Sequence, residues 1–207
     1  MFKGTPELIE QRRKEIMRVC EELYETKNFR DITLKVIGEV TDFSRPTIYN
    51  YYQSKEEIFL DLFKREYDEW NDSLQKVLDK KAISDYAKLN KTLAETLDGR
   101  KLLLKLLAVN LYDMEDNSRI ELLIDFKKSY AESIRLFKEI LKKHGTGLSD
   151  EDVDDLTITF FEAMHGFYPY ANHSEKQMEA MDKVGVGYDN GTEVELARRC
   201  LDRLLRD

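Results

Sequence analysis

Apolar residues recur at three- and four-residue spacings along most of the chain, and this helical period is the strongest constraint on its fold. The first such stripe holds Ile9, Ile16, Val19 and Leu23. Only nine glycines and three prolines occur in 207 residues, and long runs of β-branched residues are absent. We therefore predict an all-α protein. The same pattern argues against a β-sandwich, a collagen-like chain and a disordered chain.

Local start and stop signals divide the chain into predicted helices. Ser44 and Ser149 are good N-caps, and Ser54 with Glu57 forms a capping box. The predicted helices span about 9–28, 33–40, 45–52, 55–80, 83–97, 101–114, 118–144, 149–171, 174–184 and 192–206. The helix at 55–80 is long enough to leave one bundle and enter another. We therefore predict two domains, an N-terminal three-helix bundle at 1–54 and a second helical bundle at 55–207.

Residues 28–57 carry the clearest indication of function. Two short helices, 33–40 and 45–52, are joined by the three-residue turn 41–43, which is the helix-turn-helix arrangement. The second helix of that motif can enter the major groove of DNA. Simple packing would also explain the apolar residues of 45–52, so the spacing alone leaves both interpretations open.

The polar side chains of this segment suit contacts with DNA. Arg45 can donate two hydrogen bonds to guanine O6 and N7. Other polar groups can reach a phosphate or a base edge, and they are Thr47, Tyr49, Asn50, Lys55 and Lys35.

Charge supports this interpretation only locally. The whole chain has a formal net charge of −8, which is unlike a typical nucleic-acid binder. Residues 1–55 hold ten basic and nine acidic side chains, so the negative charge lies in the remainder. DNA binding must therefore depend on a local basic cluster, made of Arg45, Lys35, Lys55, Arg30 and Lys3.

Two stretches resemble a known family. Residues 28–38, Asn-Phe-Arg-Asp-Ile-Thr-Leu-Lys-Val-Ile-Gly, are similar to the entry of the tetracycline-repressor (TetR) family DNA-binding domain. Residues 43–57, Phe-Ser-Arg-Pro-Thr-Ile-Tyr-Asn-Tyr-Tyr-Gln-Ser-Lys-Glu-Glu, resemble its recognition-helix signature. The resemblance covers about residues 8–60. The chain departs from the family pattern at Asn28, Asp42 and Pro46, where glycine is common.

The resemblance implies a homodimeric DNA-binding transcriptional regulator, a repressor, on a near-palindromic double-stranded operator. It implies that Arg45 reads a base and that Thr47, Tyr49 and Lys55 contact the DNA backbone. The expected DNA-binding residues are Thr33, Lys35, Ser44, Arg45, Pro46, Thr47, Tyr49, Asn50 and Lys55. A two-fold dimer would place two recognition helices roughly 34–36 Å apart.

The family also implies a C-terminal bundle that dimerises and binds a small-molecule effector. The expected pocket residues are Trp70, Phe126, Tyr130, Met164, His165, Phe167 and Tyr168. The expected dimer interface contains Phe160, Phe161, Leu201 and Leu204. An aromatic and methionine stripe at helical spacing is equally typical of a packed core, and a single histidine there is commonly a core or interface residue.

Other functional classes find less support. The sequence holds no nucleophile elbow, P-loop or dinucleotide fingerprint, and its three histidines show no short ligand spacing, so we predict no enzyme, metal site or cofactor. A DNA-binding co-regulator whose C-terminal bundle binds a protein partner remains an alternative. We find no signal peptide or membrane span and expect a cytoplasmic protein.

Overall fold

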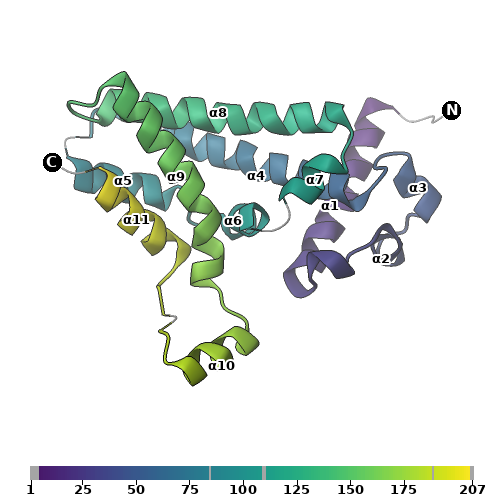
Figure 1. Ribbon diagram of the computed structural model, residues 1–207. Coiled ribbons are helices and arrows are strands. Elements are labelled where there is room, and N and C mark those ends of the chain that lie inside the picture. The colour runs from purple at the N-terminus through teal and green to yellow at the C-terminus, as the bar shows by residue number, and fades with distance from the viewer. Residues whose placement is uncertain (1–4, 84, 109–110, 188, 206–207) are drawn as a thin grey trace. The chain divides into compact units, whose positions relative to one another are not determined.

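The computed structural model describes residues 5–83, 85–108, 111–187 and 189–205. Within these ranges every regular element is a helix, as predicted (Figure 1). The α-helices are α1 (Pro6–Thr26), α2 (Leu34–Val40), α3 (Arg45–Tyr49), α4 (Lys55–Leu78), α5 (Tyr86–Glu95), α6 (Lys101–Ala108), α7 (Leu111–Asp116), α8 (Ile120–His144), α9 (Asp150–Ala171), α10 (Glu175–Val184) and α11 (Glu193–Leu204). One 3-10 turn, η1 (Phe29–Asp31), precedes α2.

The described residues form two compact units. Unit 1 comprises residues 5–65 and Leu111–Lys128, and unit 2 comprises the other described residues. Helices α4 and α8 each pass from one unit to the other without a break. The predicted boundary after residue 54 differs from this division, because unit 1 also holds the first part of α4, all of α7 and the start of α8.

Aromatic rings on α4 hold unit 1 together. Phe59 is fully buried, with its ring 5.0 Å from that of Tyr24 on α1 and 4.7 Å from that of Phe29 in η1. Phe63, one turn later, packs at 4.9 Å against Phe126 near the start of α8. These contacts between residues distant in sequence explain why the start of α4 belongs to the N-terminal unit.

Unit 2 has its own aromatic core. Trp70, the only tryptophan of the chain, is fully buried and packs 5.5 Å from Phe161 on α9. Its indole Nε1 donates to the Thr96 hydroxyl at 2.9 Å. Phe137 on α8 stacks on Phe160 at 5.0 Å. Helix α9 also packs on α6 and α11, and α11 packs on α5 (Figure 1).

Helix boundaries agree with the sequence where a capping side chain decides them. Thr33, Ser44 and Ser149 each accept a hydrogen bond from the backbone N–H three residues later, as N-caps do. The helix predicted at 101–114 corresponds to α6 in unit 2 and α7 in unit 1, and residues 109–110 between them lie outside the described residues. Leucines of α6 are buried in one unit and Met114 of α7 in the other, a distinction that apolar spacing does not encode.

Candidate functional site

The two helices of the predicted DNA-binding motif are fixed by short-range hydrogen bonds. Thr33 caps α2, and the Thr41 hydroxyl closes its last turn by donating to the carbonyl of Ile37 at 3.0 Å. Ser44 caps α3, accepting from the backbone N–H of Thr47 at 3.3 Å. Pro46 lies in the first turn of α3, where a missing N–H costs no hydrogen bond.

Helices α2 and α3 approach each other closely at Gly38. A Cβ added to Gly38 would lie 3.3 Å from the carbonyl oxygen of Phe43 and 3.6 Å from Cδ1 of Ile48. That space is tight even for a methyl group. Glycine at this position therefore lets the turn at 41–43 bring the start of α3 against α2.

One face of α3 anchors the helix, and the other is open. Ile48 is fully buried, as is Tyr52 just beyond the helix. Arg45, Tyr49 and Asn50 are exposed. The other predicted DNA-binding residues Thr33, Lys35, Ser44 and Pro46 are exposed, and Thr47 and Lys55 are half-buried. The structure thus brings Ser44, Arg45, Pro46, Tyr49 and Asn50 to the exposed side. It places Thr33 and Lys35 in the cap and first turn of the adjoining helix α2.

Arg45 and Tyr49 interact on this open face. The Arg45 guanidinium donates to the Tyr49 hydroxyl at 3.0 Å. The central carbon of the guanidinium, Cζ, lies 5.5 Å from the centre of the Tyr49 ring. The two side chains are one turn apart on α3. This contact restricts the guanidinium and leaves it on the exposed side of the helix.

The Lys55 ammonium, predicted to contact a phosphate, already makes two contacts within unit 1. Its ammonium donates to the backbone carbonyl of Phe29 at 2.6 Å and lies 4.1 Å from the centre of the Phe29 ring. Lys35, the other predicted phosphate ligand on a helix, is exposed beside Glu39 at 3.7 Å. A phosphate contact by Lys55 would have to share or replace its contact with Phe29.

Arginines of α1 support the chain after α3, which sequence reasoning missed. Arg12 donates to the Tyr51 hydroxyl at 3.2 Å, and Arg13 pairs with Asp61 on α4 at 2.7 Å. Tyr52 donates to the same Asp61 carboxylate at 2.5 Å. Burial raises the pKa of Tyr52, so its hydroxyl keeps its proton at neutral pH. Arg12 and Arg13 lie 39 and 48 residues before their partners, and no local pattern connects them.

Unit 2 contains an apolar pocket of about 180 Å³ that α9 helps to line. Its wall consists of Tyr67, Tyr130, Ile134, Thr157, Ile158, Phe161, Glu162 and His165. Two of these, Tyr130 and His165, are among the predicted pocket residues. The His165 Nδ1 lies 3.0 Å from the carbonyl oxygen of Leu107, which orients the ring. The rings of Tyr67 and Tyr130 meet edge to face at 5.6 Å.

The other predicted pocket residues do not line this pocket. Trp70 and Met164 are fully buried, and Phe167 is 6% exposed, so these three are core residues of unit 2. Phe126 is a core residue of unit 1. The half-buried ring of Tyr168 lies 6.0 Å from the Lys101 ammonium. A stripe at helical spacing identifies the buried side of a helix, but it cannot distinguish a filled core from the wall of a cavity.

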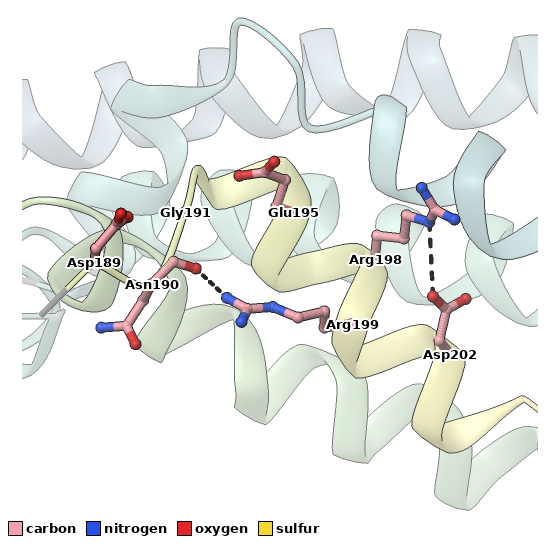
Figure 2. Close-up of a pocket in the computed structure, with 7 residues that line it drawn as sticks. All are labelled: Asp189, Asn190, Gly191, Glu195, Arg198, Arg199 and Asp202. Carbon is pink, nitrogen blue, oxygen red and sulfur yellow. Dashed lines mark hydrogen bonds and ion pairs between the residues drawn. The ribbon is translucent and has the colours of Figure 1, made fainter. Parts of the chain in front are cut away.

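A second hollow of about 510 Å³ lies at the start of α11, and its chemistry is entirely different. Figure 2 shows its seven lining residues, which are Asp189, Asn190, Gly191, Glu195, Arg198, Arg199 and Asp202. Arg199 donates to the backbone carbonyl of Asn190, and Arg198 pairs with Asp202 at 3.6 Å. It is an open, charged surface rather than the apolar cavity that the sequence predicted.

The predicted dimer residues are mostly internal to one chain. Phe160 and Leu201 are 1% exposed and Phe161 is 7% exposed, so these side chains have almost no surface to offer a second subunit. Leu204 is half-buried. The exposed side of α9 presents Ile158 and Tyr170 instead.

Two further observations limit the chemistry. Among the described residues, no group of histidine, cysteine and carboxylate side chains is arranged to hold a metal ion. No helix in the described ranges is long and apolar enough to cross a membrane.

The class of protein follows from the exposed helix α3, its helix-turn-helix support and the second helical unit joined to it. These features define a DNA-binding regulator. The family described as bacterial regulatory proteins, tetR family, matches residues 16–62. The tetracyclin repressor-like C-terminal domain matches residues 64–199. The chain therefore belongs to the TetR family of transcriptional regulators.

Solved structures share the fold. A TetR/AcrR family regulator from Thermobifida fusca YX-ER1 has a TM-score of 0.64 and 19% identity, covering 95% of this chain and 97% of its own. FadR from Bacillus subtilis, solved with stearoyl-CoA, has a TM-score of 0.59 and 16% identity over 93% and 97%. FadR from Thermus thermophilus, solved with lauroyl-CoA, has a TM-score of 0.57 and 19% identity over 93% of each chain. No curated protein sequence matches the chain.

Family membership confirms the main functional prediction. Proteins of this family are ligand-responsive, dimeric, DNA-binding transcriptional regulators and not enzymes. The alternative of a co-regulator whose C-terminal bundle binds a protein partner is not favoured, because the C-terminal match is to the tetracyclin repressor-like domain.

Proposed function

We propose that this protein is a repressor that acts in the cytoplasm as a homodimer on a near-palindromic operator. Arg45 reads a base in the major groove, and Thr47, Tyr49 and Asn50 contact base edges or phosphates beside it. Thr33, Lys35, Ser44, Pro46 and Lys55 complete the surface facing the DNA backbone. The observation that carries this proposal is the two-sided character of α3, with Ile48 fully buried and Arg45, Tyr49 and Asn50 exposed.

Selection from a random duplex library tests the operator half of this proposal. We expect the full-length protein to enrich a two-fold-related sequence and to bind it with two subunits per duplex. Arg45→Ala should bind the enriched duplex more weakly. Arg135→Ala is the matched control, because it removes the same charge from an exposed site on α8 in unit 2. Failure to enrich any sequence at low salt would reject operator binding.

We further propose that the apolar pocket in unit 2 binds the effector. Its aromatic lining with Thr157, Glu162 and His165 combines apolar surface with a few polar groups, as is usual for small-molecule sites. The volume of about 180 Å³ is below the roughly 300–1,000 Å³ of sites for drug-sized ligands, so a large effector requires the pocket to expand. Fatty acyl-CoA is the first class to test, since two regulators of similar fold were solved with such ligands.

Trp70 provides a built-in assay for the pocket. It is the chain's only tryptophan and contacts Phe161, which lines the pocket. Saturable changes in its emission on adding lauroyl-CoA or stearoyl-CoA, together with release of the enriched duplex, would support acyl-CoA as the effector. His165→Ala should weaken the response, whereas Arg135→Ala should not. Unchanged emission and DNA occupancy would reject this class of effector.

A further inference from the structure

The chain that follows the recognition helix α3 is held by Arg119. This residue pairs with Glu57, 62 positions earlier in the sequence. Arg119, directly before α8, donates to both carboxylate oxygens of Glu57, at 2.7 Å from Nε and 2.9 Å from Nη2. Its backbone N–H donates to the same carboxylate at 3.1 Å. Such two-point guanidinium–carboxylate pairs fix orientation as well as distance. Both residues belong to unit 1.

Two further hydrogen bonds tie the same pieces of chain together. Nη2 of Arg119 also donates to the backbone carbonyl of Tyr51 at 3.1 Å. The Ser54 hydroxyl donates to the backbone carbonyl of Asn117 at 3.0 Å. Glu57 in turn accepts from the backbone N–H of Gln53 at 2.7 Å. Residues 51–57, which run from the connection after α3 into the first turn of α4, are therefore held by residues 117–119. We call this set of contacts the 119 clamp.

The carboxylate at the centre of the clamp is deeply buried. Glu57 is 1% exposed. Burial by itself would raise the pKa of Glu57, but hydrogen bonds from Arg119 and from the backbone of Gln53 outweigh it and hold the pKa below its ordinary value. Glu57 is therefore ionised at neutral pH. Without Arg119 a buried charge would lose its main partner, so the connecting segment would have to rearrange to solvate it.

The recognition helix depends on such external support. Helix α3 has only five residues, and a helix so short is unstable without tertiary contacts. Ile48 anchors its middle, and the chain immediately after it is where the clamp acts. A shift of the Tyr51 carbonyl would be transmitted directly to Tyr49 and Arg45, because only a few residues separate them.

We propose that Arg119 is a positioning residue of the DNA-reading surface, holding the exit of α3 through Glu57 and Tyr51 so that Arg45 and Tyr49 meet the duplex at the correct angle. The proposal rests on the proposed function, in which α3 reads DNA. Arg119 lies within the C-terminal family match at residues 64–199, but its contacts place it in unit 1. The working DNA-reading unit thus includes a segment that the family boundary assigns to the other domain.

Operator affinity of full-length variants tests the proposal, using the duplex enriched by the wild-type protein. We expect Arg119→Ala to weaken binding by roughly tenfold or more, the size of losing a hydrogen bond to a charged group. Arg119→Lys should fail to restore affinity, because an ammonium cannot reproduce the guanidinium fork. Glu57→Gln should weaken binding too, and the double variant should lose less than the two single losses combined. Arg135→Ala, which breaks a matched two-point pair with Glu132 on exposed α8, should bind as the wild type does.

The salt dependence of binding separates positioning from direct contact. Arg119 has 42% of its side chain exposed, so a phosphate contact is the main rival explanation. Loss of a phosphate contact would flatten the slope of log affinity against log salt by about one, whereas loss of positioning leaves the slope unchanged. A flattened slope, or wild-type affinity in Arg119→Ala, would overturn the proposal.

Controls for folding keep the result interpretable. The amplitude of binding at saturation reports the fraction of folded protein, and the dissociation constant reports the quality of the surface. A reduced amplitude with an unchanged dissociation constant would overturn positioning in favour of a purely structural role. If Arg119→Ala does not fold, Arg119→Lys carries the same test, since it keeps the charge beside Glu57. If wild type itself enriches no duplex, the proposed function fails, which is a different outcome from equal binding by wild type and variant.

Discussion

Replacing Arg45 with alanine should remove base discrimination at one operator position while leaving unit 1 folded. Arg45 is exposed, and its side-chain contacts are both with Tyr49, a hydrogen bond of 3.0 Å and a ring contact at 5.5 Å. Truncating such a surface side chain changes the free energy of unfolding by less than about 0.5 kcal/mol. Any large change in DNA binding by Arg45→Ala must therefore come from the interface.

The size of the effect follows from what Arg45 gives up when it binds. A two-point contact with guanine contributes about 1–3 kcal/mol of discrimination. Moving the guanidinium off the exposed ring of Tyr49 costs about 0.5–1 kcal/mol. Taken at the middle of both ranges, the net discrimination is about 1.25 kcal/mol, or roughly eightfold in preference for one base. Tyr49→Phe removes the competing acceptor but keeps the ring, so it should preserve that base preference.

Fluorescence anisotropy with the enriched duplex and a set of single-base substitutions measures this preference directly. We expect the wild type to distinguish guanine from other bases at one position in each half-site, and Arg45→Ala to lose that distinction there alone. Arg135→Ala again supplies the charge-matched control in unit 2. Binding by Arg45→Ala with base preferences identical to wild type at every position would refute the assignment.

Three further predictions concern Lys55, His144 and Ile48. Lys55→Ala should weaken DNA binding to all sequences and flatten the slope of log affinity against log salt by about one. Lys55→Arg is the control that keeps the charge. An unchanged slope would show that Lys55 serves only its contact with Phe29. His144 is 5% exposed and accepts from the backbone N–H of Ile83, and burial lowers its pKa from the ordinary value of 6.5. The unfolded chain therefore binds more protons than the folded chain below about pH 6.5. The free energy of unfolding is thus highest above that pH. It falls as the pH drops through 6.5 toward the lowered pKa of His144 in the folded chain. Urea unfolding at pH 7.5 and 5.5 should show this loss in wild type and a smaller one in His144→Gln; equal losses would contradict it. Ile48→Ala should destabilise unit 1 by about 2–5 kcal/mol, because it leaves a cavity at a fully buried position. Circular dichroism should then show an early unfolding step that the Trp70 emission of unit 2 does not follow. A single transition seen by both probes would contradict this prediction.

The predictions from sequence were reliable where a short stretch of chain decides the outcome. Thr33, Ser44 and Ser149 form their caps because a side-chain oxygen and a backbone N–H three residues later meet in any helix start. The two sides of α3 were equally predictable, since Ile48 and Arg45 lie on different sides of a helix whatever surrounds it. The prediction at 101–114 missed that α6 packs in unit 2 and α7 in unit 1.

The residues that line a pocket or a dimer surface cannot be chosen from helical periodicity, for a physical reason. Periodicity marks the apolar side of a helix but is the same for a filled core, a cavity wall and a subunit interface. Phe160 on α9 is buried within one chain, whereas Ile158 and Glu162 on the same helix line the pocket. Only the packing of several helices decides between these outcomes.

The amino-acid sequence alone determined that this chain is helical, where most of its helices begin, and which short segment is the candidate DNA-reading surface. Hydrogen bonds within one turn and a 3.6-residue period set these properties, and both act over a few neighbouring positions. The tertiary structure decided that residues 117–119 hold the exit of α3, that Lys55 binds the Phe29 carbonyl, and which aromatic rings leave a cavity. Those contacts join residues up to about 100 positions apart, and their geometry exists only once the helices are packed.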